Sequence, residues 1–71
     1  MIDIEKNFTY HKPTSDQIKL YEQVRGQTFS YANYLQLAIP ESRELSIALT
    51  KLEEVVMWAN AAIARNWNKE D

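Results

Sequence analysis

Aromatic and basic side chains gather near the start of this chain, and their types suit contact with a base and a phosphate. Phe8, Tyr10 and His11 lie close together, and Lys12 follows them. A flat aromatic ring can stack on a nucleobase for roughly 1–3 kcal/mol, and a nearby cation can hold a phosphate. Two structural alternatives stay open. The two aromatic rings can fold back as a hydrophobic lid, and His11 can serve only as a loop hydrogen-bonder.

Two arginines farther along the chain are candidates for anion binding. Arg25 directly precedes Gly26, within an otherwise apolar stripe. Arg43 falls in the first turn of a predicted helix, where a cation disfavours the helix but free backbone N–H groups attract anions. Arg43 is therefore a candidate phosphate clamp, and a purely structural role is its alternative. For Arg25 the alternative is an ion pair with Glu22 or Glu41.

No pattern of residues predicts catalysis, a cofactor or a metal. The chain has no cysteine and one histidine, so it offers neither a thiol nucleophile nor a histidine–cysteine zinc site. It has no glycine-rich phosphate loop. The adjacent carboxylates of Glu53 and Glu54 point in different directions on a helix, so they cannot act as a facing pair. We predict a binding protein and not an enzyme.

Length and net charge limit which classes of protein this chain can belong to. The 71 residues, with a net charge of −2, predict one domain over 1–71 and argue against a DNA-binding protein. The N-terminus lacks the basic and apolar regions of a signal peptide, and the uncharged run Val55–Ala64 is too short to span a bilayer. We expect a soluble, cytoplasmic protein, which suits the lack of cysteine.

The pattern predicts an all-α protein. Residues 1–14 read as an extended or irregular lead-in. Thr14 and Gln17 have the spacing of a capping box and open a helix over about 15–38. Pro40 ends it, and Ser42 is the predicted N-cap of a second helix over about 42–66. The short connection forces an antiparallel hairpin.

Each predicted helix has an apolar stripe facing the other. On the first helix it consists of Ile18, Tyr21, Val24, Thr28, Tyr31 or Ala32, Leu35 and Ala38. On the second helix it consists of Leu45, Ala48, Leu49, Leu52, Val55 or Val56, Ala59, Ala62 and Ile63. Gly26 should cost about 1 kcal/mol relative to alanine, and it suggests a bend or the close approach of another backbone.

The second helix is apolar most of the way round, so one partner helix cannot cover it. Its apolar residues outside the stripe are Ile47, Met57, Trp58, Ala61 and Ala64. A chain this short offers only one other long helix, and it has no disulfide to stabilise a small core. We therefore predict a homo-oligomer with these residues at its interface, and any binding site at a seam between subunits.

Three segments resemble a known family. They are Phe8–Pro13, Pro40–Ala48 and Thr50–Ile63, and the third contains the distinctive pattern Thr-x-Leu-Glu-Glu-x-x-Met-Trp-Ala. The chain resembles the phage anti-CBASS cyclic-oligonucleotide sponges, whose domain is an Acb/Tad-type hairpin. The resemblance runs from about Phe8 to Asn66. It implies a homohexamer of helical hairpins that sequesters the cyclic messengers of bacterial CBASS immunity in the host cytoplasm without cleaving them.

The resemblance also implies roles for residues. In the family, a tyrosine near the N-terminus and a cation on the first long helix hold cyclic dinucleotides between paired protomers. Here Tyr10 matches the tyrosine, with His11 beside it, and Arg25 matches the cation. The family's cation is typically lysine, which makes Lys19 the alternative to Arg25. A second pocket for cyclic trinucleotides uses an arginine that leads the second helix, matched by Arg43. This chain is shorter between the helices, which weakens the second match.

Two rival functions remain from the sequence. The first is inhibition of a host protein by a helical oligomer through its apolar helix face. The second is a structural oligomer that binds no ligand.

Overall fold

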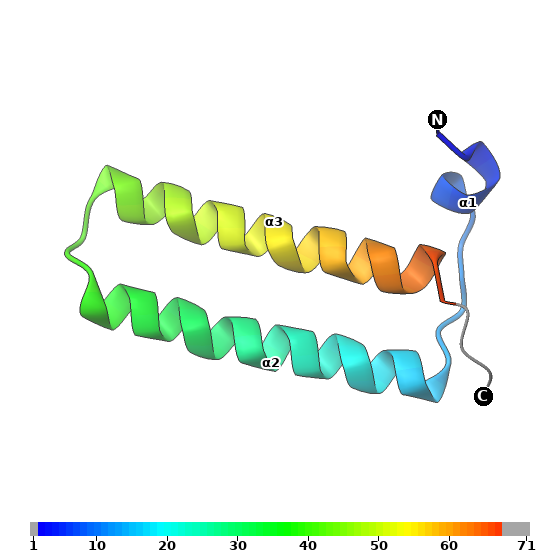
Figure 1. The fold of residues 1–71 in the computed structure, drawn as a ribbon, viewed down its shortest axis with the longest axis horizontal. Coiled ribbons are helices and arrows are strands. Elements are labelled where there is room, and N and C mark those ends of the chain that lie inside the picture. The colour runs from blue at the N-terminus through cyan, green and yellow to red at the C-terminus, as the bar shows by residue number, and fades with distance from the viewer. Residues whose placement is uncertain (1, 68–71) are drawn as a thin grey trace.

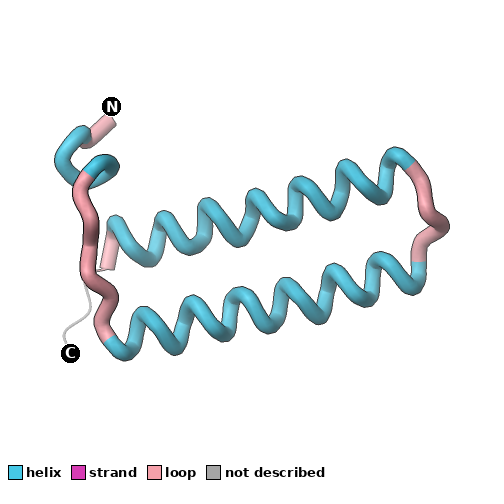
Figure 2. Tube along the Cα trace, turned by 180° about the vertical axis from the view of Figure 1, so that it is seen from behind, coloured by secondary structure: helices cyan, strands magenta, loops and turns pink. Residues whose placement is uncertain are grey.

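The computed structural model describes residues 2–67, and within them it contains three helices and no strand. These are α1 (Ile4–Phe8), α2 (Ser15–Ala38) and α3 (Arg43–Arg65). The two long helices lie side by side and run antiparallel, with the connecting loop at one end (Figures 1 and 2). The short helix α1 lies at the other end, which we call the open end. The all-helical hairpin agrees with the fold class predicted from sequence. The sequence also predicts that residues 68–71 fray, and these residues lie outside the described range.

The capping box predicted for α2 is present. The Thr14 hydroxyl accepts from the Gln17 backbone N–H at 3.2 Å, and the Gln17 side-chain oxygen accepts from the Thr14 N–H at 2.8 Å. These bonds satisfy two donors that a helix N-terminus leaves free. The helix ends at Ala38 because Pro40 disfavours helical backbone at Ile39. The start and end of α2 therefore follow from local sequence.

Helix α3 is capped in the same local manner. The Ser42 hydroxyl accepts from the Leu45 N–H at 3.1 Å and so serves as the N-cap. At the other end Asn66 caps the helix, and its backbone N–H donates to the Ala62 carbonyl at 3.0 Å.

The lead-in is not wholly extended or irregular, so that expectation was wrong in part. Helix α1 occupies Ile4–Phe8 because Asp3 is an N-cap whose carboxylate accepts from the Lys6 N–H at 3.1 Å. Glu5 in the first turn adds a favourable interaction with the helix dipole. A single turn of helix is marginal by itself.

The seam between α2 and α3 is narrower than predicted. On α2 it consists of buried or half-buried Gln17, Leu20, Tyr21, Val24, Thr28, Ala32 and Leu35. On α3 it consists of buried or half-buried Leu45, Leu49, Leu52, Val56, Ala59, Asn60 and Ile63. The expected seam residues Ile18, Ala38, Ala48 and Ala62 are exposed instead. Where the pattern left pairs open, Ala32 and Val56 face the seam while Tyr31 and Val55 are exposed.

A buried polar side chain explains part of this difference at the open end. Gln17 is 5% exposed, and its amide nitrogen donates to the Ile63 carbonyl on α3 at 3.1 Å. This side chain therefore caps its own helix and joins the two helices at once. Gln17 therefore lies in the seam position at which the apolar stripe had predicted Ile18.

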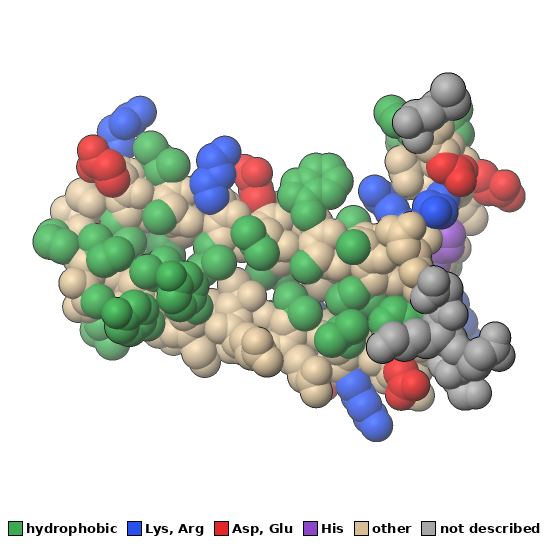
Figure 3. All heavy atoms as spheres, in the orientation of Figure 1, with side chains coloured by type: hydrophobic (Ala, Val, Ile, Leu, Met, Phe, Trp, Pro, Cys, Tyr) green, Lys and Arg blue, Asp and Glu red, His purple; other side chains and the backbone are tan. Residues whose placement is uncertain are grey.

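The hairpin leaves most of its apolar surface exposed. Leu45, at 7% exposed, is the one hydrophobic side chain within residues 2–67 that is buried. The accessible surface of 6121 Å² compares with roughly 4,600 Å² expected for a compact monomer of 8.3 kDa. The molecule measures 43 × 27 × 15 Å, and hydrophobic side chains gather openly at the loop end (Figure 3). No helix in the described range is long and apolar enough to cross a membrane.

Replacing Gln17 tests the tie between the helices. We expect Gln17→Ala to lower the free energy of unfolding by about 1–3 kcal/mol, because it removes a donor to the carbonyl of half-buried Ile63 and half of the capping box. Urea denaturation followed by circular dichroism measures this. The exposed Gln23→Ala is the matched control, and an equal loss in both variants would contradict the assigned role.

Gly26 provides a second test. A methyl group built there has nothing within 4 Å in the hairpin. We therefore expect Gly26→Ala to raise the free energy of unfolding by roughly 0.5–1 kcal/mol, because alanine loses less conformational freedom in a helix. Thermal unfolding of Gly26→Ala beside the neighbouring Gln27→Ala measures the gain. A loss of stability would instead place the backbone of another copy against Gly26.

Candidate functional site

The aromatic side chains of the lead-in are not used by the fold. Phe8 and Tyr10 are each 81% exposed, so they do not form a lid over the hairpin. That alternative from the sequence was wrong within one chain. Two large rings held in solvent are available for contact with a ligand or with another copy.

His11 holds the lead-in in shape. A ring nitrogen, Nε2, lies 2.8 Å from the Lys6 carbonyl of α1. The Lys6 ammonium in turn donates to the side-chain oxygen of Asn66, the C-cap of α3, at 3.2 Å. These two contacts connect the turn of α1, the extended segment before α2 and the end of α3. His11 thus forms the loop hydrogen bond that was one of its two predicted roles, and Tyr10 is presented next to it.

Arg25 has no ion pair with any residue in the described range, so pairing with Glu22 or Glu41 does not occur there. Its side chain is exposed on α2. It lies about 15 Å along the helix from Ser15, at 1.5 Å per residue. No contact between described residues joins Tyr10 to Arg25. One chain therefore does not bring the two predicted dinucleotide contacts together.

Lys19 lies nearer to the open end. It lines a shallow hollow of about 280 Å³ together with Asp16, Leu20, Gln23 and Trp67. The carboxylate of Asp16 in the same hollow reduces the attraction for an anion there. Arg25 forms no ion pair with any described residue.

Arg43 lines a second hollow, of about 350 Å³, on the outer side of α3. The other lining residues are Ser46, Ile47, Thr50 and Lys51. Lys51 adds a second cation that the sequence reasoning did not consider, although its spacing from Arg43 on one helix was a readable signal. The ammonium of Lys51 lies 3.6 Å from the Glu54 carboxylate, a solvent-exposed pair that contributes little. Two cations and two hydroxyls suit a phosphate, while Ile47 offers an apolar contact.

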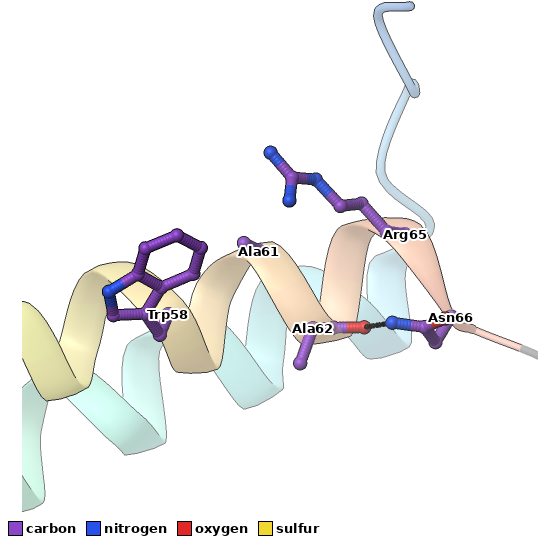
Figure 4. A pocket seen from close by; sticks show the side chains of 5 residues that line it. All are labelled: Trp58, Ala61, Ala62, Arg65 and Asn66. Carbon is purple, nitrogen blue, oxygen red and sulfur yellow. Dashed lines mark hydrogen bonds between the residues drawn. The ribbon is translucent and has the colours of Figure 1, made fainter. Parts of the chain in front are cut away.

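A third hollow, of about 210 Å³, lies toward the end of α3. Trp58, Ala61, Ala62, Arg65 and Asn66 line it. Figure 4 shows the indole of Trp58 and the guanidinium of Arg65 rising from the same side of α3, with Ala61 between them. The Asn66 amide donates to the Ala62 carbonyl at 3.3 Å. Trp58 does not pack inside the hairpin, and the sequence reasoning missed Arg65.

Comparison with protein families identifies the fold. The model of the Acb2/Tad1 hairpin domain matches residues 1–64. The chain belongs to this family. The match confirms the resemblance to the anti-CBASS sponges seen in the sequence. It covers the lead-in and all but the last residue of α3, so every candidate residue from Phe8 to Arg43 falls within it. The family is one of binding domains.

Comparisons with curated proteins and with solved structures gave no match. The family match is therefore the comparison that bears on function.

Proposed function

We propose that this chain is a phage anti-defence protein that sequesters the cyclic dinucleotide messengers of bacterial CBASS immunity in the host cytoplasm. Membership of the Acb2/Tad1 hairpin family, over residues 1–64, is the observation that carries this proposal. The mechanism is binding without cleavage, because the candidate residues are stacking rings and cations and include no nucleophile paired with a base. Removing the free messenger deprives the nucleotide-activated effectors of their signal.

The binding site is composite. Tyr10 from one copy and Arg25 from another hold the cyclic dinucleotide at the seam between them, the ring stacking on a base and the guanidinium holding a phosphate. Two facts support this division. Tyr10 is 81% exposed, and Arg25 has no acidic partner within the described residues. Phe8 and His11 flank the ring, and His11 orients it by anchoring the lead-in. Lys19 is the alternative cation on α2.

The protein acts as a homo-oligomer, with a homohexamer as the proposed state. The accessible surface exceeds that of a compact monomer by about 1,500 Å², and one protein partner typically covers about 800 Å². The excess is therefore enough for more than one contact with other copies. A pocket formed between folded subunits is already ordered, so binding avoids the cost of arranging a flexible loop.

A second pocket for cyclic trinucleotides is proposed at Arg43. The hollow that Arg43 lines also contains Lys51 and the hydroxyls of Ser46 and Thr50. A messenger with three phosphates presents more charge than one with two, and several copies of this cationic hollow can meet it together. The free backbone N–H groups at the start of α3 add to the attraction.

Isothermal titration calorimetry with cyclic dinucleotides tests the first pocket. We expect Tyr10→Ala and Arg25→Ala each to weaken binding about ten- to a hundredfold, since a stacked base or a held phosphate contributes roughly 1–3 kcal/mol. Arg25→Lys should retain binding, because an ammonium can also hold a phosphate. The exposed aromatic Tyr34→Ala is the matched control for the tyrosine.

Sedimentation of each variant shows whether the assembly persists. Normal binding by both alanine variants would mean that the site lies elsewhere. If the unmodified protein gave no heat with any cyclic di- or trinucleotide, the sponge function would be rejected, and inhibition of a host protein through the exposed helix face would become the leading function.

Arg43→Ala separates the two pockets. We expect it to weaken the binding of a cyclic trinucleotide at least tenfold and to leave the affinity for a cyclic dinucleotide unchanged, because Arg43 lies on α3, away from Tyr10 and Arg25. Glu44→Ala, which removes a neighbouring charge of opposite sign, is the control. Equal weakening of both ligands would contradict two separate pockets.

A further inference from the structure

Helix α3 has a second face that the hairpin does not use. It consists of Ala48, Lys51, Val55, Trp58, Ala62 and Arg65, and we call it the outer α3 stripe. These positions recur alternately at three and four residues, which is the spacing of two helices packed along their length. Val55 is 56% exposed and Trp58 is 62% exposed. The seam with α2 lies on another side of the helix, through residues such as Leu52 and Val56.

The stripe contains a preformed hole for a side chain. Trp58, Ala61, Ala62 and Arg65 line the hollow of about 210 Å³. Their spacing, at three, four and seven residues from Trp58, is that of the four residues that surround each inserted side chain in a helix pair. Trp58 and Arg65 rise from the same side of α3 with Ala61 between them, while the Ala62 methyl group points to another side of the helix (Figure 4). The small Ala61 side chain permits a partner helix to come close.

We propose that the outer α3 stripe is the contact between two copies of this chain, with their α3 helices antiparallel. Parallel packing would set Lys51 against Lys51, Arg65 against Arg65 and Glu44 against Glu44. Antiparallel packing brings the Glu44 end of one helix beside the Arg65 end of the other, so the charges are complementary. It also brings Lys51 toward the Trp58 ring of the second copy, which favours a cation–π contact.

The available area supports a second copy as the occupant. The excess of accessible surface over a compact monomer, about 1,500 Å², exceeds the roughly 800 Å² that a stable interface covers on each partner. This inference rests on the self-association proposed above, but it does not depend on any ligand. It specifies the helix, the face and the direction of the contact.

The antiparallel arrangement has a definite centre. Val55 lies midway between Ala48 and Ala62 on the stripe, so a two-fold axis passes close to it. The two Val55 side chains then lie near each other, while Ala48 of one copy faces the Ala62 region of the second. Parallel packing would instead bring every residue of the stripe next to its own counterpart.

Disulfide crosslinking tests this geometry directly, because the chain has no cysteine. Single-cysteine variants Val55→Cys, Ala48→Cys and Ala62→Cys are oxidised at low micromolar concentration and examined on non-reducing gels. We expect Val55→Cys to form a covalent dimer and Ala48→Cys alone to remain largely uncrosslinked. A mixture of Ala48→Cys with a larger, tagged Ala62→Cys should form the mixed dimer. Glu53→Cys, exposed on the other flank of α3, is the control and should remain uncrosslinked.

Other outcomes overturn the inference. Strong self-crosslinking of Ala48→Cys would show parallel packing. An oligomer in which Val55→Cys does not crosslink would place the interface on another face. Sedimentation of the unmodified protein as a monomer would remove the self-association itself. Calorimetry on reduced Val55→Cys measures cyclic dinucleotide binding separately, so a failure of this interface is distinguishable from a failure of the proposed function.

Discussion

Two helices can bury only one face each against the other, and this constraint governs the whole molecule. Leu45 is the one buried hydrophobic side chain in the described range, and the other seam residues are half-buried except for the polar Gln17. At about 25 cal/mol per Å² of apolar surface removed from water, so small a core offsets little of the conformational entropy lost on folding. We propose that the remaining apolar surface on α3 contributes to stability through contact with other copies.

Because the hairpin uses one face of each helix, the other faces are available for different tasks. Within residues 2–67, the exposed ring of Tyr10 takes no part in the contacts that hold the fold, and Arg25 forms no ion pair. The Arg43 hollow and the outer α3 stripe lie on neighbouring parts of the same helix and share Lys51. Substitutions at these positions should therefore affect binding or assembly with little effect on the seam. A chain of this size can combine a ligand site and a subunit contact because its core uses only one face of each long helix.

The open end is held by polar contacts where the apolar seam is thinnest. Gln17 joins α2 to the Ile63 carbonyl, and Lys6 joins α1 to Asn66. His11 then connects the extended lead-in to α1. Hydrogen bonds are directional, so they define the position of the lead-in more closely than apolar contacts would. That position determines how the exposed Tyr10 ring is presented to its surroundings.

The sequence by itself determined the helical class and the N-caps of the two long helices, and it supplied the residues proposed to contact a nucleotide, because caps, proline and side-chain chemistry act within a few residues. It identified each helix face only to within about one position. Tertiary packing decided between Val55 and Val56, and it replaced Ile18 by Gln17, because helix rotation depends on the partner helix and on the bond to Ile63. Lys51 and Arg65 were identified as lining residues of the Arg43 and Trp58 hollows only from the structure, although their spacing on one helix was already readable in the sequence. The separation of Tyr10 from Arg25 is likewise a tertiary fact, since a straight helix holds the arginine away from its own lead-in.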